Sequence, residues 1–247
     1  MTDHLLVEDR GPARWLRLNR PEKRNAVTRA MAETLRTELG RTAHDADIVA
    51  LVLTGTGETF CAGVDVKEAL QGPDAALFEE RSTPLWPVDE LVNFPKPLLC
   101  CLNGAAVGGG ATLAMTTDLR VAAESASLAF SLGRLGLTPE VGSSFLLWRQ
   151  VGYGVALDLM LTGRKVPAAE ALTLRLVQRV VPDGDAEAAT QALAEALAEL
   201  PHDAAARTKQ VLRAGLEASY ADARKHELRE LAEFGRRTSE TTPGEKR

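Results

Sequence analysis

The chain has 247 residues, a length that suits one large domain or one domain with a small appendage. Hydrophobic residues make up 45% of the chain and charged residues 26%, and these ordinary globular values argue against intrinsic disorder. The formal net charge of −5 argues against a general nucleic-acid-binding protein, which normally carries a basic surplus.

Cysteine usage and hydropathy predict a protein of the cytoplasm that does not enter a membrane. The chain has three cysteines, of which Cys100 and Cys101 are adjacent, and this set makes no disulfide framework. Residues 1–4 lack the basic and apolar segments of a secretory signal. The weakly polar run 98–115 is interrupted by Asn103 and four glycines, so we expect a buried strand that leads into a helix.

The order of the predicted elements indicates an α/β core followed by a helical region. Two short strands come first, then a helix capped by Thr28, then three buried strands, and finally mainly helices. The predicted strands lie at 4–8, 13–18, 48–53, 97–102 and 119–122, and the main predicted helices at 28–42, 186–200, 204–216 and 221–235. We expect a core over residues 1–190 and a helical region over 191–247.

Several catalytic signatures are missing from the sequence. No segment matches a phosphate-binding P-loop, a dinucleotide fingerprint or the nucleophile elbow of a serine hydrolase. The histidines, at positions 4, 44, 202 and 226, do not have the spacing of metal ligands. The sequence therefore predicts neither a metal nor a redox cofactor.

Two glycine-rich turns, at 57–65 and 103–110, each follow a buried strand. Glycines let a backbone come close to a ligand, and three successive glycines at a helix start leave N–H groups free to face an anion. If the two turns face each other, their N–H groups can hold one developing oxyanion. The alternative is that these glycines only permit tight turns and close helix packing.

The turns belong to a longer set of motifs that covers about residues 5–235. This set resembles the crotonase (enoyl-CoA hydratase/isomerase) superfamily, with matching segments at 19–26, 60–65, 96–110, 118–122, 135–139, 161–164 and 176–181. The resemblance implies the ClpP/crotonase-like α/β fold, a spiral of ββα units with C-terminal helices that build a trimer or a dimer of trimers. It also implies an acyl-CoA thioester substrate, so that CoA arrives as part of the substrate.

Residue by residue, the resemblance assigns the oxyanion hole to the backbone N–H groups of Val64 and Gly109. The residues that it implies for substrate and CoA binding are Ala26, Ala62, Asp65, Val66 and Gly108, with Lys23 and Arg24 as partners of the CoA phosphates. Lys23 and Arg24 are equally compatible with a solvated pair of loop charges.

The chain departs from the hydratase pattern at both catalytic carboxylates. Hydratases of the superfamily use two glutamates, and the matching positions here hold Thr112 and Leu132. A carboxylate occurs nearby, because Glu140 follows Pro139 in a Pro-Glu-x-x-Ser-Ser segment that resembles the peroxisomal type of 3,2-trans-enoyl-CoA isomerase. The resemblance implies that Glu140 is the base that moves a proton from C2 to C4. Without the family, Glu140 is typical of a first helical turn.

The surroundings of Glu140 are also predicted. An apolar environment raises the pKa of a carboxyl group, and Phe130, Leu132, Leu137 and Val141 are the expected sources of that environment. Phe78 and Trp86 are candidates for the wall of the acyl tunnel, although packing alone explains them as well.

Other functions stay open at this point. The same fold supports hydration, dehalogenation or thioester hydrolysis, although dehalogenation suits an aspartate better than Glu140. A non-catalytic CoA-thioester-binding protein would explain Thr112 and Leu132, but it leaves Glu140 without a reason. RNA binding, which some members of the superfamily show, is disfavoured by the acidic balance and by the lack of a Lys/Arg-rich helix.

Overall fold

The structure is a computed structural model that describes residues 4–65, 85–201 and 203–241, with side chains as far as residue 236. The chain divides into two compact units, Met1–Ala198 and Glu199–Arg247. The predicted division after residue 190 falls inside helix α8 (Ala186–Ala198), and the whole of this helix belongs to the first unit.

The larger sheet of the first unit is mainly parallel and is buried. Its strand order is β1-β2-β3-β5-β7-β10, in which β1 and β2 pair antiparallel and the other neighbours pair parallel. Every residue of β3 and β5 is buried, as their continuous apolar sequences predict for strands covered on both faces. The strands are β1 (Leu5–Arg10), β2 (Ala13–Leu18), β3 (Ala50–Gly55), β5 (Leu98–Leu102), β7 (Leu119–Ala123) and β10 (Arg179–Val181).

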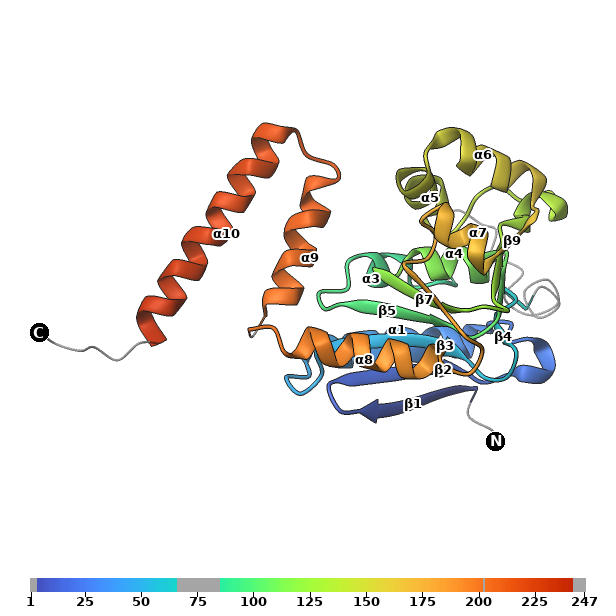
Figure 1. Cartoon of the computed structure of the whole chain (residues 1–247), viewed down its shortest axis with the longest axis horizontal. Helices are drawn as coiled ribbons and strands as arrows, with labels where there is room; N and C mark the ends of the chain where they lie inside the picture. The colour runs from blue at the N-terminus through green and yellow to red at the C-terminus, as the bar shows by residue number, and fades with distance from the viewer. Residues whose placement is uncertain (1–3, 66–84, 202, 242–247) are drawn as a thin grey trace, which may run out of the picture. The chain divides into compact units, whose positions relative to one another are not determined.

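A second, smaller sheet has the order β4-β6-β8-β9. Its strands are β4 (Thr59–Cys61), β6 (Ala105–Val107), β8 (Ser127–Ala129) and β9 (Lys165–Pro167). Along the chain, β3, β5 and β7 in the first sheet are each followed directly by β4, β6 and β8 in the second, and each pair leads on to helices. The result is a spiral of ββα units, which confirms the predicted fold class (Figure 1).

The helices of the first unit agree with the sequence where their apolar pattern is long. Helix α1 (Arg29–His44) begins after Thr28, whose side chain accepts a hydrogen bond from the Met31 amide over 3.2 Å. The other helical segments are η1 (Pro21–Lys23), α3 (Val88–Val92), α4 (Gly109–Met115), η3 (Ser131–Leu135), α5 (Ser143–Val151), α6 (Tyr153–Thr162) and α7 (Ala168–Thr173).

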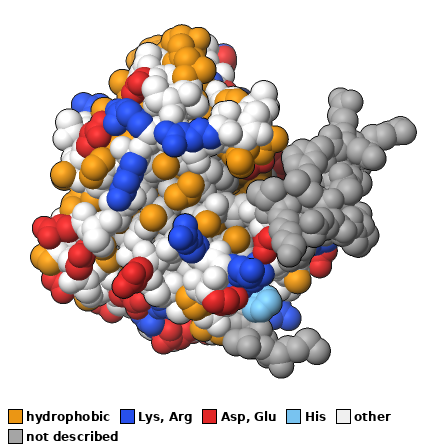
Figure 2. Space-filling view, turned by 90° about the vertical axis from the view of Figure 1, so that its right-hand side faces the viewer, with side chains coloured by type: hydrophobic (Ala, Val, Ile, Leu, Met, Phe, Trp, Pro, Cys, Tyr) orange, Lys and Arg blue, Asp and Glu red, His pale blue; other side chains and the backbone are white. Residues whose placement is uncertain are grey.

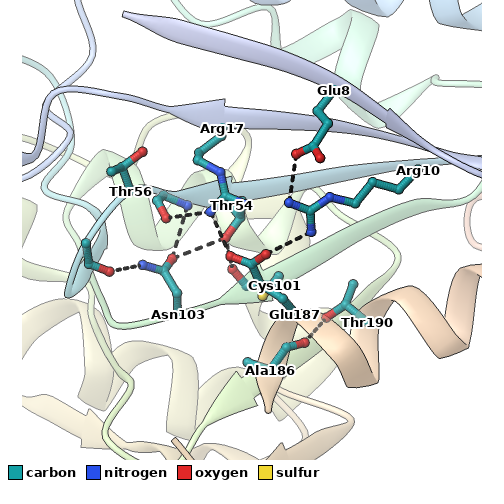
Figure 3. A network of polar contacts seen from close by, with 12 residues as sticks. Glu8, Arg10, Arg17, Thr54, Thr56, Cys101, Asn103, Ala186, Glu187 and Thr190 are labelled. Carbon is teal, nitrogen blue, oxygen red and sulfur yellow. Dashed lines mark hydrogen bonds and ion pairs between the residues drawn. The ribbon is translucent and has the colours of Figure 1, made fainter. Parts of the chain in front are cut away.

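Helix α8 lies along the larger sheet, against β2, β3, β5, β7 and β10 (Figure 1). Its Glu187 carboxylate accepts hydrogen bonds from Arg17 and Arg10 of the first hairpin, each over 2.8 Å (Figure 3). The bond from Arg17 is the main reason why the pKa of Glu187 lies below its ordinary value. These contacts join the helix to β1 and β2.

The second unit is a helical hairpin of α9 (Ala204–Gly215) and α10 (Tyr220–Thr241). The Arg207 guanidinium lies 5.5 Å from the centre of the Phe234 ring, so the two helices contact each other. Large apolar side chains remain exposed on the hairpin, namely Leu212, Leu216, Tyr220, Leu228 and Leu231. Within the described ranges, no helix is both long and apolar enough to cross a membrane.

One face of the molecule has a mixed surface. In Figure 2, Lys and Arg side chains are interspersed with Asp and Glu side chains and with small groups of hydrophobic ones. The three cysteines are not part of any surface, because all of them are buried. Burial raises the pKa of the Cys61 thiol to about 12, which makes it an inert core residue.

Candidate active site

The first glycine turn, residues 57–65, includes β4, and its residues after β4 are held against the loop 20–26 by backbone hydrogen bonds. The amide of Ala62 donates to the carbonyl of Arg24 over 3.0 Å, and the amide of Val27 donates to the carbonyl of Gly63 over 2.8 Å. The turn and the loop with the predicted phosphate-binding residues therefore form one backbone assembly.

A buried ion pair strengthens the same assembly. The Arg20 guanidinium, which is largely buried, lies 3.2 Å from Oδ2 of Asp65 and donates to the carbonyl of Ala26 over 2.8 Å. Asp65 therefore has a structural partner in addition to its predicted place near CoA. Lys23 and Arg24 are exposed, which fits both the predicted phosphate contacts and a solvated pair of loop charges.

The two glycine turns touch each other, and their glycines are required for that contact. A Cβ added to Gly63, whose φ is +97°, would lie 3.2 Å from the amide nitrogen of Gly109. A Cβ on Gly110 would overlap the carbonyl group of Cys61 and lie 2.8 Å from its Cβ. Gly108, which precedes α4, has a φ of +54° that favours glycine. The glycines therefore permit tight turns and close packing, and they also let the two turns face each other.

Among the described residues, the two backbone N–H groups that the resemblance assigns to the oxyanion hole have no hydrogen-bond partner. Val64 forms a parallel β-bridge with Val27, but the two hydrogen bonds of this bridge are donated by the amides of Val27 and Asp65. The Val64 amide itself takes no part in them. The Gly109 amide is at the first position of α4, where no intrahelical acceptor exists. Neither amide donates to any acceptor in the described part of the chain. The structure thus places two unpaired donors on touching turns.

Asn103 fixes the second turn relative to the first (Figure 3). Its Oδ1 accepts from the Gly55 amide over 3.0 Å, and its Nδ2 donates to the carbonyl of Gly57 over 2.7 Å. The Thr54 hydroxyl lies 3.3 Å from Oδ1 and 3.0 Å from the carbonyl of Cys101. One side-chain amide therefore links the ends of β3 and β5.

Glu140 lies just ahead of helix α5 and not in its first turn. Its carbonyl accepts a hydrogen bond from the Ser143 amide over 3.0 Å, and α5 begins at Ser143. Between them, Val141 has a φ of +54° and Gly142 a φ of +71°. A β-branched residue with positive φ is rare and strained, and such strain is concentrated at functional sites. The alternative of an ordinary helix N-terminal residue is therefore not what the structure shows.

The Glu140 side chain reaches the second glycine turn. A Cβ added to Gly109 would lie 3.1 Å from Oε1 of Glu140 and 3.2 Å from Cζ2 of Trp86. Burial raises the pKa of the Glu140 carboxyl above its ordinary value, and no charged group contributes to that shift. A partly buried carboxylate thus lies next to Gly109, whose amide is one of the two unpaired donors.

The residues at the two altered hydratase positions also flank this turn, and neither supplies a carboxylate. Thr112 is buried within α4, and its hydroxyl donates to the carbonyl of Gly109 over 3.0 Å. Leu132 is buried as well, and a Cβ on Gly108 would lie 3.8 Å from its Cδ2. At these two positions the turn therefore meets an apolar side chain, Leu132, and a hydroxyl that is already bonded within α4, that of Thr112.

A buried arginine joins the far ends of the helices that border the site. Arg120 of β7 donates to the carbonyl of Thr117, which follows α4, over 2.6 Å, and to Oε1 of Gln150 in α5 over 3.0 Å. Its Nε donates to the carbonyl of Leu176 over 2.5 Å. Burial lowers the pKa of Arg120 to about 10. Arg120 was not predicted to support the site, because its role depends on segments far apart in the sequence.

The remaining predicted residues are partly accounted for. Phe130 and Val141 are buried as expected for an apolar surround, whereas Leu137 is only half-buried. Val66 and Phe78 lie outside the described residues. Among the described residues, no three His, Cys, Asp or Glu side chains form a group suited to a metal ion.

The touching glycine turns, the unpaired amides and the partly buried glutamate are the features that the family resemblance implies for an acyl-CoA site. The family model described as enoyl-CoA hydratase/isomerase matches residues 14–245. The chain belongs to the enoyl-CoA hydratase/isomerase family of the crotonase superfamily. The members of this family are enzymes that act on CoA thioesters.

Similar proteins agree with this assignment. The chain is 40% identical to enoyl-CoA hydratase EchA19 of Mycobacterium tuberculosis over 78% of its own length and 73% of that protein. It is 38% identical to 1,2-epoxyphenylacetyl-CoA isomerase of Escherichia coli over 75% of its length and 72% of that protein. The crystal structure of enoyl-CoA hydratase from Bacillus anthracis superposes with a TM-score of 0.84 at 29% identity, covering 92% of this chain and 89% of that one.

Proposed function

We propose that this enzyme isomerises 3-enoyl-CoA to trans-2-enoyl-CoA, with Glu140 as the base and the Val64 and Gly109 amides as the oxyanion hole. One observation carries the proposal: Oε1 of Glu140 lies against Gly109, beside one of the two unpaired amides. A thioester whose oxygen accepts from these amides presents its C2 carbon close to the carboxylate.

The reaction needs only one carboxylate. Glu140 takes a proton from C2, and the electrons of the C–H bond pass into the thioester to give a dienolate. The two amides stabilise the negative charge on the thioester oxygen, and each such donor typically contributes about 10²–10³-fold in rate. Glu140 then returns the proton to C4, and the double bond forms between C2 and C3. The burial that raises the pKa of Glu140 favours its holding the proton between the two transfers.

Hydration of 2-enoyl-CoA is the second candidate, and the name of the Mycobacterium tuberculosis relative favours it. Water addition in hydratases uses two glutamates to position and activate the water. Thr112 and Leu132 stand at those positions, and neither side chain can accept a proton as a carboxylate does. The side chains around the turn therefore support isomerisation over hydration.

For the CoA part of the substrate, the proposal uses the first turn and its loop. Ala26, Ala62 and Asp65 lie in the backbone assembly described above, and Lys23 and Arg24 are the exposed cations beside it. Gly108 completes the second turn. No cofactor is proposed other than the CoA of the substrate, and the cytoplasm is the proposed compartment.

A homotrimer or a dimer of trimers is the proposed assembly. The exposed apolar side chains of α9 and α10, among them Leu212, Leu228 and Leu231, provide a surface that a second copy can bury. Light scattering that gives the mass of a monomer at micromolar concentration would contradict this assembly.

The test of function is a spectrophotometric assay with cis- and trans-3-hexenoyl-CoA. The expected result is formation of the conjugated 2-enoyl thioester by the wild type and none by the Glu140→Ala variant. Binding of hexanoyl-CoA by both proteins, measured by calorimetry, is the control for an intact site. If the wild type binds hexanoyl-CoA and leaves both hexenoyl thioesters unchanged, 3-enoyl isomerisation is the wrong reaction.

A further inference from the structure

Trp86 carries a buried hydrogen-bond donor that has no partner. Its side chain is only 4% exposed, and Nε1 finds no acceptor in the described part of the chain. An unsatisfied buried donor destabilises the folded protein, so such groups are rare in native structures and usually have a specific cause. A phenylalanine would fill a similar volume without this cost, so packing does not explain the indole nitrogen.

The edge of the indole that holds this donor faces the candidate active site. A Cβ on Gly109 would lie 3.2 Å from Cζ2 and 3.5 Å from Cε2 of Trp86, and Nε1 is bonded to Cε2. Oε1 of Glu140 lies 3.1 Å from the same point. The indole edge and the carboxylate oxygen therefore meet over one glycine.

The Glu140 carboxylate lacks a hydrogen-bond or ion-pair partner too, as far as the described residues extend. In the free enzyme water can solvate this half-buried group. When an acyl group occupies the space over Gly109, that water is displaced, and a buried carboxylate needs a donor in its place. The Trp86 N–H is a buried donor that belongs to the indole packed against this glycine. Catalytic hydrogen bonds often reach their final geometry only in the substrate complex.

We propose that Trp86 is a positioning residue for Glu140, whose Nε1–H donates a hydrogen bond to one carboxylate oxygen once substrate is bound. The other oxygen is then directed at the C2 and C4 protons. This inference rests on the proposed role of Glu140 as the base. Trp86 itself does not exchange a proton with the substrate, and it acts only through the orientation of the carboxylate.

A double-mutant cycle tests this coupling. The Trp86→Phe variant is expected to lower kcat for 3-hexenoyl-CoA at least tenfold and to leave KM within about twofold. In the Glu140→Gln background, the same substitution is expected to change the residual rate by less than twofold, because the carboxylate on which it acts is gone. Trp148→Phe, on the exposed side of α5, is the matched control and is expected to retain wild-type kcat.

Three kinetic results would overturn the proposal. The first is an unchanged kcat in Trp86→Phe. The second is a higher KM at constant kcat, which would make Trp86 a binding contact. The third is an equal loss of rate in the wild-type and Glu140→Gln backgrounds, which would show that Trp86 acts independently of the carboxylate.

A spectroscopic readout works without turnover and without the Trp86→Phe variant. The chain has three tryptophans, so a ¹⁵N-labelled sample gives three indole N–H signals. Trp15 already donates to Gln191 over 2.9 Å, and Trp15→Phe and Trp148→Phe assign the third signal to Trp86. Addition of hexanoyl-CoA is expected to move the Trp86 proton downfield in the wild type and not in Glu140→Gln.

The spectroscopic outcomes separate this proposal from the proposed function. A Trp86 signal that stays in place when hexanoyl-CoA binds, or that moves equally in both proteins, would refute the positioning role. If the shift occurs but 3-hexenoyl-CoA is not converted, the contact between Trp86 and Glu140 stands and the assigned reaction is wrong.

Discussion

Replacement of Gly109 by alanine perturbs the candidate base without touching its own side chain. The new methyl group would lie 3.1 Å from Oε1 of Glu140 and 3.2 Å from Cζ2 of Trp86, so both neighbours must move by a few tenths of an ångström. A misplacement of 1 Å can reduce an enzymatic rate about 10²-fold. We therefore expect Gly109→Ala to lower kcat/KM for 3-hexenoyl-CoA by about 10- to 100-fold. Gly109 does not have a positive φ, so alanine suits its backbone conformation and the fold is expected to persist.

Two other glycines provide matched controls for this experiment. Gly154 of α6 has open space around it, so Gly154→Ala is expected to retain both activity and thermal stability. Gly110→Ala would overlap the Cys61 carbonyl, so it is expected to lower the unfolding temperature as well as the rate. Calorimetry and the hexenoyl-CoA assay on the same samples separate these effects. Full activity in Gly109→Ala would refute the idea that the position of Glu140 over this glycine matters.

Three further predictions follow from other parts of the structure. Asn103→Ala is expected to leave the Gly55 amide and the Gly57 carbonyl without the Asn103 side chain, and to lower both the unfolding temperature and kcat/KM. The free energy of unfolding from a urea titration is expected to fall by about 1–3 kcal/mol, and unchanged stability would show that the bridge is dispensable. Thr28→Ala removes the cap of α1 and is expected to cost about 0.5–2 kcal/mol in the same titration with no loss of kcat, and a lower kcat would reveal an unforeseen link to the site. Burial raises the pKa of Glu140, and only its ionised form removes a proton, so the activity of the wild type is expected to rise with pH, with a midpoint above the ordinary glutamate pKa of 4.5. A rate that has already reached its plateau at pH 4.5 would contradict a raised pKa for the base.

The long elements of the fold were predictable from the sequence because their patterns are long. The predicted strands at 97–102 and 119–122 match β5 and β7 to within a residue at each end, and Thr28 caps α1 as predicted. The three-residue strands β4, β6, β8 and β9 were not predicted, because so few residues cannot show a periodic pattern. They form the second sheet only through pairings between segments that are distant in the chain.

The candidate site was predictable in its residue types but not in its contacts. The glycines of both turns and Glu140 were identified from their motifs, whereas the approach of Trp86 to Gly109 has no signal in the sequence. The left-handed φ of Val141 was also unexpected, because a β-branched residue rarely adopts it. The support from Arg20 and Arg120 depends on packing between separate segments, which local patterns do not encode.

The Glu140→Gln variant tests the central claim most directly, when turnover of 3-hexenoyl-CoA and thermal unfolding are measured on one preparation at pH 7. General-base catalysis typically contributes about 10²–10⁴-fold, so turnover is expected to fall by that factor. Burial raises the pKa of Glu140 in the folded state, so its contribution to stability is present below the unfolded pKa of 4.5 and is lost as the pH rises through the folded value. A neutral glutamine avoids that loss at pH 7, and the unfolding temperature is expected to equal or exceed that of the wild type. Turnover within tenfold of the wild type would contradict the assignment of Glu140 as the base.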